Sequence, residues 1–145
     1  MLNPSRYRLL VVGKIRKGWI KEGLDSYLKR LPGLIVNEIR ASNPQKEAEA
    51  IQTQLKDNET LIVLMEEGDL LPSIPFSECL RTFGSKRLVF VIGGANGIAP
   101  EVKALAHLRL SLSPLTFPHE IARLLLVEQI YRATTIAQGS PYHRV

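Results

Sequence analysis

The chain alternates between short apolar runs and longer stretches in which apolar residues recur every three or four positions. Short continuous apolar runs are typical of strands buried on both faces of a parallel sheet, and the longer spacing is typical of amphipathic helices. Regular alternation of the two predicts an α/β fold with a mainly parallel sheet flanked by helices. The predicted strands are Arg8–Gly13, Leu34–Ile39, Thr60–Met65, Leu88–Ile92 and Leu108–Leu112.

The last predicted helix, which runs from Pro118 to about Gln138, differs from the helices before it. Pro118 suits its first turn, because proline lacks an N–H group that a helix start would leave unpaired. Apolar residues lie around most of its circumference, so the helix should be buried on more than one side. A second copy of the chain is the simplest cover, and we therefore expect a twofold-symmetric homodimer. The earlier helices are expected at Trp19–Leu31, after Pro44, after Pro75 and at Pro100–Ala106.

The length of 145 residues and the hydrophobic content of 45% fit a single domain over residues 1–145. No apolar run approaches the roughly 20 residues of a membrane span, and the first residues lack the layout of a signal peptide. We therefore expect a cytoplasmic protein without a membrane partner. The single cysteine, Cys79, and the three scattered histidines show no metal-ligand spacing, so no metal is expected.

The net charge of +5 is concentrated near the start of the chain. Residues 1–40 hold nine Lys and Arg residues against three acids, whereas the remaining 105 residues hold ten against eleven. A local basic segment is what a phosphate-binding face requires, and Lys14, Arg16 and Lys17 in the loop after the first strand are its centre. These three residues are predicted to bind RNA. A modestly basic surface without a nucleic-acid partner is the alternative.

Three loops that follow predicted strands are candidates for a ligand site: Met65–Asp69, Gly93–Gly97 and Ser111–Phe117. Ligands of open parallel sheets bind beyond the carboxyl ends of the strands. Glycines in the second loop would let a flat ligand contact the backbone directly. Their spacing matches neither the dinucleotide fingerprint nor the phosphate loop of nucleoside triphosphatases, which disfavours a nicotinamide-dependent oxidoreductase.

The last 60 residues contain several sequence motifs whose combination and order are specific to one protein family. They resemble those of the ribosomal large-subunit pseudouridine N3-methyltransferases, which belong to the SPOUT class of knotted methyltransferases. The resemblance covers essentially the whole chain. The motifs that carry it are Val91–Gly97, Leu110–Ser113, Leu115–His119, Arg123, Glu128–Ala133 and Pro141–Arg144.

The resemblance implies a C-terminal trefoil knot, S-adenosylmethionine as the cofactor, and a dimer in which the partner subunit completes the site. At the third strand the family commonly has an acid directly after leucine, where this chain has Met65; Glu66 or Glu67 would then have to replace it. The positions that correspond to the family's cofactor contacts are Leu64, Gly94, Leu112, Ser113, Pro114, Leu115, Thr116 and Phe117.

Methyl transfer to a pseudouridine nitrogen needs in-line placement and removal of a proton, and no metal. His119, Glu128 and His143 are the candidate proton acceptors. For His119 the alternative is a hydrogen-bonded residue that fixes the helix start. For Glu128 it is a structural ion pair with Arg132, four residues on.

The C-terminal tail carries an aromatic ring, an imidazole and a guanidinium in Tyr142, His143 and Arg144. Stacking by Tyr142 and phosphate contact by Arg144 suit RNA, and Arg132 is expected to join them. An ordinary disordered tail is the alternative. The expected function is methylation of N3 of a pseudouridine in large-subunit rRNA; the alternative is a non-catalytic RNA-binding or ribosome-associated module with the same fold.

Overall fold

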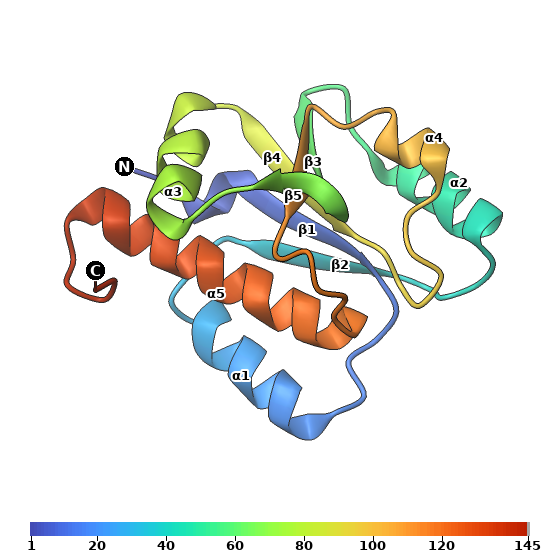
Figure 1. Cartoon of the computed structure of the whole chain (residues 1–145), viewed down its shortest axis with the longest axis horizontal. Coiled ribbons are helices and arrows are strands. Elements are labelled where there is room, and N and C mark those ends of the chain that lie inside the picture. Colours follow the sequence, from blue (N-terminus) through green and yellow to red (C-terminus); the bar gives the residue numbers. More distant parts are fainter. Residues whose placement is uncertain (145) are drawn as a thin grey trace.

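The computed structural model describes residues 1–144 and contains one five-stranded parallel sheet (Figure 1). The strand order is β2-β1-β4-β3-β5, so that β4, fourth along the chain, lies between β1 and β3. All four strand pairings are parallel, which confirms the predicted α/β fold. The strands are β1 (Tyr7–Val12), β2 (Ile35–Ile39), β3 (Glu59–Leu70), β4 (Arg87–Ile92) and β5 (Leu108–Ser111).

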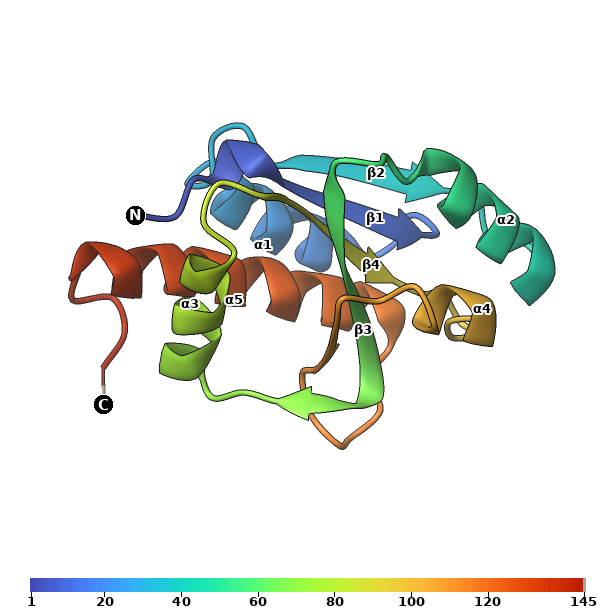
Figure 2. The same cartoon turned by 90° about the horizontal axis from the view of Figure 1, so that it is seen from above.

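Helices cover both faces of the sheet (Figures 1 and 2). On one face α1, α3 and α5 pack on alternate strand residues such as Leu9 and Phe90, and on the other α2 and α4 pack on Leu10 and Val89. Neighbouring strand residues thus point to opposite, equally apolar layers, which explains the continuous apolar runs. The helices are α1 (Gly18–Leu28), α2 (Pro44–Gln54), α3 (Ser73–Thr82), α4 (Pro100–Lys103) and α5 (His119–Gln138); a 3₁₀ turn, η1 (Pro4–Arg6), precedes β1.

The third strand is longer than predicted. The sequence predicts a strand that ends at Met65 and a loop over the next four residues, but β3 continues to Leu70. Its pairing with β5 shifts between Leu64 and Asp69, because both residues lie opposite Leu110. The residues between Leu64 and Asp69 form a bulge in the pairing of β3 with β5, and they do not form a free loop. The prediction of a loop was therefore wrong, although the acids do lie at the sheet edge.

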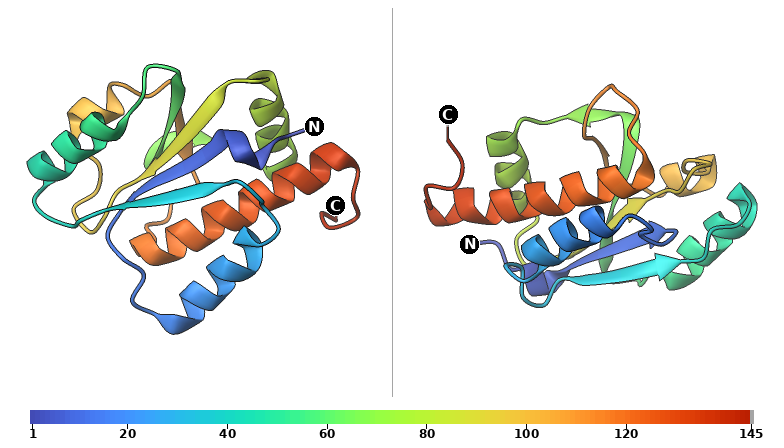
Figure 3. Two further views of the ribbon diagram at one scale, coloured as in Figure 1. Left: turned by 180° about the vertical axis from the view of Figure 1, so that it is seen from behind. Right: turned by 90° about the horizontal axis from the view of Figure 1, so that it is seen from below.

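The last helix spans nearly the predicted residues. Pro118 is its N-cap, one residue before the helix, and Gly139 ends it in the left-handed conformation with φ of 73°. Leu126, Val127 and Ile130 are fully buried within one chain, whereas Leu125 on another side is 36% exposed. Figure 3 shows α5 lying beside α1 across the sheet. None of the described helices combines the length and the apolarity needed to cross a membrane.

We predict that Gly68→Ala lowers stability by about 2 kcal/mol, because overpacking against backbone cannot be relieved by a side-chain rotation. A Cβ atom at Gly68 would lie 2.8 Å from the backbone of Arg109 and Leu110 in β5. Urea unfolding measures the loss. Gly18→Ala is the matched control, since its Cβ would meet nothing within 4 Å, and its stability should be unchanged or slightly raised. Equal stability of both variants would contradict the described packing.

Candidate functional site

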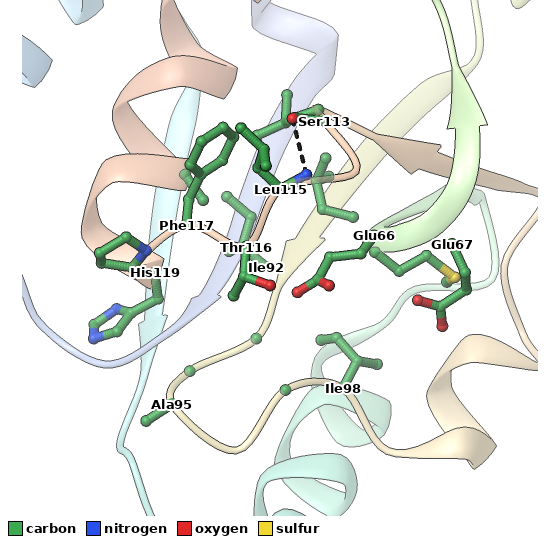
Figure 4. Close-up of a pocket in the computed structure, with 18 of the residues that line it drawn as sticks. Glu66, Glu67, Ile92, Ala95, Ile98, Ser113, Leu115, Thr116, Phe117 and His119 are labelled. Carbon is green, nitrogen blue, oxygen red and sulfur yellow. Dashed lines mark hydrogen bonds between the residues drawn. The ribbon is translucent and has the colours of Figure 1, made fainter.

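A cavity of about 730 Å³ lies beyond the carboxyl ends of β4 and β5 and against residues 64–67 of β3 (Figure 4). Its walls come from all three segments predicted for the ligand site, and its size is that of a small-molecule pocket. Seven of the eight predicted cofactor positions line it, and Pro114 does not. The seven are Leu64, Gly94, Leu112, Ser113, Leu115, Thr116 and Phe117.

The glycine loop after β4 has little room for side chains at Gly93 and Gly94. A Cβ atom at Gly93 would lie 2.7 Å from the carbonyl oxygen of Gly97, and one at Gly94 would lie 3.0 Å from Val12 Cγ1. The Gly97 N–H donates to the Gly94 carbonyl at 3.0 Å, and Gly97 has φ of 73°. The glycines are therefore required by a tight turn that also presents bare backbone to the cavity.

The wall opposite the glycine loop is fixed by two serines. Ser111 Oγ donates to the Ser113 carbonyl at 3.0 Å. Ser113 Oγ accepts the Leu115 N–H at 3.0 Å (Figure 4). These bonds hold the turn that leads from β5 to α5. Leu115, at its tip, is 69% exposed, so an apolar side chain at the pocket rim is left without cover within one chain.

The two acids that follow Met65 take different directions. Glu67 forms an ion pair with Lys103 of α4, and the hydrogen bond from this ammonium group lowers the pKa of Glu67. Glu66 points its carboxylate into the cavity (Figure 4). Both acids and the apolar side chain of Met65 line the cavity, and of the two acids left open by the sequence Glu66 is the one directed into it.

His119 is the first residue of α5 and lies at the edge of the cavity (Figure 4). Its Nδ1 atom is buried and has no hydrogen-bond partner among the described residues. It is packed on Gly13, where a Cβ atom would lie 3.3 Å from His119 Cε1. His119 therefore does not fix the helix start through a hydrogen bond, which was the alternative to a role in catalysis.

Glu120, which the sequence analysis overlooked, holds the start of α5. Its Oε1 accepts the backbone N–H groups of Arg16 at 2.9 Å and Lys17 at 3.2 Å. Burial opposes ionisation, but these two hydrogen bonds outweigh it and hold the pKa of Glu120 below its usual value. The sequence feature that could have indicated this role is an acidic residue in the first turn of a long helix, where the helix dipole favours negative charge.

The comparisons with known proteins agree with this geometry. The family model described as "Predicted SPOUT methyltransferase" matches residues 5–143, nearly the whole chain. This chain belongs to the SPOUT methyltransferase family. Proteins named "Ribosomal RNA large subunit methyltransferase H" are similar to it: one from Synechococcus sp. CC9605 is 63% identical over 143 residues, and one from Prochlorococcus marinus MIT 9211 is 58% identical over 144. Both alignments cover 99% of each chain.

Solved structures of other methyltransferases share the fold of this SPOUT family member. A probable methylase from Haemophilus influenzae aligns with a TM-score of 0.62 and 11% identity, covering 98% of this chain and 72% of the other. The SpoU methyltransferase AviRb from Streptomyces viridochromogenes, in complex with the cofactor AdoMet, aligns with a TM-score of 0.51 and 15% identity, covering 88% and 57%. The trefoil knot stays a prediction from the resemblance.

The second half of α5 carries a polar cluster that lies away from the pocket. Glu128 pairs with Arg132 at 2.8 Å, as the i,i+4 spacing predicted, and accepts the Tyr142 hydroxyl at 2.9 Å. Arg132 lies 3.1 Å from His143 Nδ1 and 4.8 Å from the centroid of the Tyr142 ring. The tail is therefore docked on its own helix as far as His143, and burial raises the pKa of Tyr142.

The structure thus separates the predicted catalytic residues of this methyltransferase. His119 lines the cavity, whereas Glu128 and His143 do not. Glu128 lies nine residues along α5, which at 1.5 Å per residue is about 13 Å from His119 along the helix axis. Within one chain the three cannot act on one atom. Lys14, Arg16, Lys17 and Arg144 are exposed, and no metal-binding group of three His, Cys, Asp or Glu residues occurs within residues 1–144.

Glu120→Gln is expected to lower stability at pH 7 by about 1 kcal/mol, because two hydrogen bonds lose their charged acceptor. The pKa of Glu120 is lowered on folding, so its contribution is full above the ordinary value of 4.5 and disappears as the pH falls through the lowered pKa. Urea unfolding over a series of pH values should therefore show the full difference at pH 7 and a difference that shrinks as the pH falls below 4.5. Glu78→Gln, at an exposed surface pair, is the control and should be neutral.

Proposed function

We propose that this SPOUT methyltransferase transfers a methyl group from S-adenosylmethionine to N3 of a pseudouridine in large-subunit rRNA. The observation that carries the proposal is the convergence of the three predicted segments on one cavity, at seven of the eight positions that the resemblance indicated. The names of relatives that align over 99% of their length support the substrate. The substrate in turn suggests that the protein acts in the cytoplasm.

The cavity, with a volume of about 730 Å³, has room for S-adenosylmethionine, a bent and partly flat molecule. Bare backbone at Gly93 and Gly94 provides close hydrogen-bonding groups, and Leu64, Leu112 and Phe117 provide apolar walls. Glu66 is placed to accept hydrogen bonds from the polar groups of the ligand. When bound, S-adenosylmethionine supplies a methyl group on an electrophilic sulfonium, so the protein has to orient the acceptor and exclude water.

The N3 nitrogen must lose its proton before or during transfer. His119 is the one predicted proton acceptor that lines the cavity. An imidazole nitrogen that carries no proton can accept one from the substrate. We assign His119 to this role, with Glu128 and His143 acting from the partner subunit.

A homodimer would bring the tail to the pocket. A groove of about 270 Å³ between α3, β5 and α5 adjoins the cavity, since Leu112 and Phe117 line both. Around it Leu70, Ile74 and Leu125 are exposed apolar side chains. A second copy that covers this groove would bury them and place its own Tyr142, His143 and Arg144, with Arg132, beside the substrate. This arrangement reconciles the predicted site residues with their separation in one chain.

Calorimetry with S-adenosylmethionine tests the cofactor. The wild-type protein should bind, and Gly93→Ala should weaken binding at least about tenfold, because its Cβ would displace the glycine loop. Gly94→Ala should lower the affinity for the cofactor less, since the nearest atom to its Cβ is Cγ1 of the Val12 side chain. Gly18→Ala should bind the cofactor normally. Thermal melts confirm folding. A folded wild-type protein that does not bind the cofactor would contradict the proposal and favour the non-catalytic module.

Subunit mixing tests the shared site. A tail variant with Tyr142, His143 and Arg144 changed to Ala should bind the cofactor normally but methylate large ribosomal subunits poorly. Mixed with Gly93→Ala, which has an intact tail and a damaged pocket, it should recover about a quarter of wild-type activity, because half of the dimers then contain one complete site. No recovery in dimers shown to exchange would mean that each tail serves its own chain.

A further inference from the structure

A second depression, of about 680 Å³, lies next to the cofactor cavity where β1, β2 and the start of α5 meet. The two hollows share one residue, His119. A group held in this depression would therefore lie on the far side of His119 from the cofactor. Its lining residues are Gly13, Lys14, Arg16, Glu38, Ile39, Arg40, Ala41 and His119, which we call the basic depression.

The charge of the basic depression is positive. Lys14, Arg16 and Arg40 contribute three cations, and none of them pairs with an acid within residues 1–144. Its one acid, Glu38, is neutralised by Arg123 at 2.8 Å. α5, a helix of 20 residues, begins at His119, so the positive end of its dipole lies beside the depression. An anion would be attracted here without competition from a free carboxylate.

The loop that carries Lys14 and Arg16 is held at three points. The Gly13 N–H donates to the Ile39 carbonyl at 2.8 Å, and the Gly13 carbonyl accepts from Arg123 Nη2 at 2.8 Å. Glu120 binds the backbone on the far side of the loop. The first two contacts tie the loop to β2 and α5, so the cations start from a defined position and lose little freedom on binding.

His119 gives a second indication that a ligand binds in the basic depression. A buried ring nitrogen without a hydrogen bond is costly, and ligands commonly satisfy such groups. Protonated Nδ1 donates to a phosphate oxygen, and unprotonated Nδ1 accepts from a ribose hydroxyl. Both groups belong to a nucleotide backbone, and His119 lines the cofactor cavity as well as the depression.

We propose that the basic depression binds a phosphodiester of the RNA strand beside the target nucleotide, with Arg40 as a phosphate ligand together with Lys14 and Arg16. The inference rests on the proposed function and adds to it the place where the RNA backbone lies. Glu120 and Arg123 are positioning residues, because they act on the loop and not on the RNA.

The test compares Arg40→Ala with Lys86→Ala, a control just before β4 at the opposite edge of the sheet. With large ribosomal subunits that lack the modification, Arg40→Ala should raise KM about tenfold, leave kcat within about twofold, and reduce the salt slope of binding by about one. Arg40→Lys should restore most of the loss. Cofactor affinity should be unchanged in all variants.

Co-sedimentation with the same subunits measures binding without turnover, so the subsite is tested even where methylation is slow. Equal KM, binding and salt slope for Arg40→Ala and Lys86→Ala would overturn the proposal that the basic depression binds a phosphodiester, while leaving the proposed function intact. Loss of cofactor binding by the wild-type protein would instead overturn the proposed function. Retention of the salt slope in a Lys14→Ala, Arg16→Ala double variant would also contradict the subsite.

Discussion

The attachment of α5 to the end of β1 is the constraint on which the site depends. Arg123 reaches from the second turn of the helix to the Gly13 carbonyl and to Glu38, and Glu120 binds the backbone of the next loop residues. Arg123 is only 3% exposed in its side chain, so its charge is held where solvent cannot compensate a lost partner. These contacts fix His119 between the cofactor cavity and the basic depression.

Because α5 is long, its two ends contact different parts of the molecule. The first turn belongs to the pocket, while Glu128 and Arg132, two to three turns on, hold the C-terminal tail (Figure 1). A rigid helix cannot bring both ends to one substrate atom. The proposed sharing of the site between two chains would resolve this conflict, with the second chain lying on the apolar groove beside Leu112 and Phe117.

Glycines set the shape of the cavity through steric limits. Gly93 and Gly94 let two loops approach closely, and Gly68 lets the irregular part of β3 lie against the backbone of β5. The shift in register between Leu64 and Asp69 keeps the intervening acids at the sheet edge, where Glu66 faces the cavity and Glu67 pairs with α4. Small changes in local packing thus decide which acid meets the ligand.

The amino-acid sequence by itself determined the five strands, the order of strands and helices, and three segments that meet at one edge of the sheet. Those features follow from local periodicity and from the rule that parallel strands end together. Tertiary structure alone decided that β3 continues past Met65, that Glu120 anchors the basic loop, and that the tail docks on its own helix through Tyr142 and Glu128. Each depends on contact between residues more than ten positions apart in the chain, which no local pattern encodes.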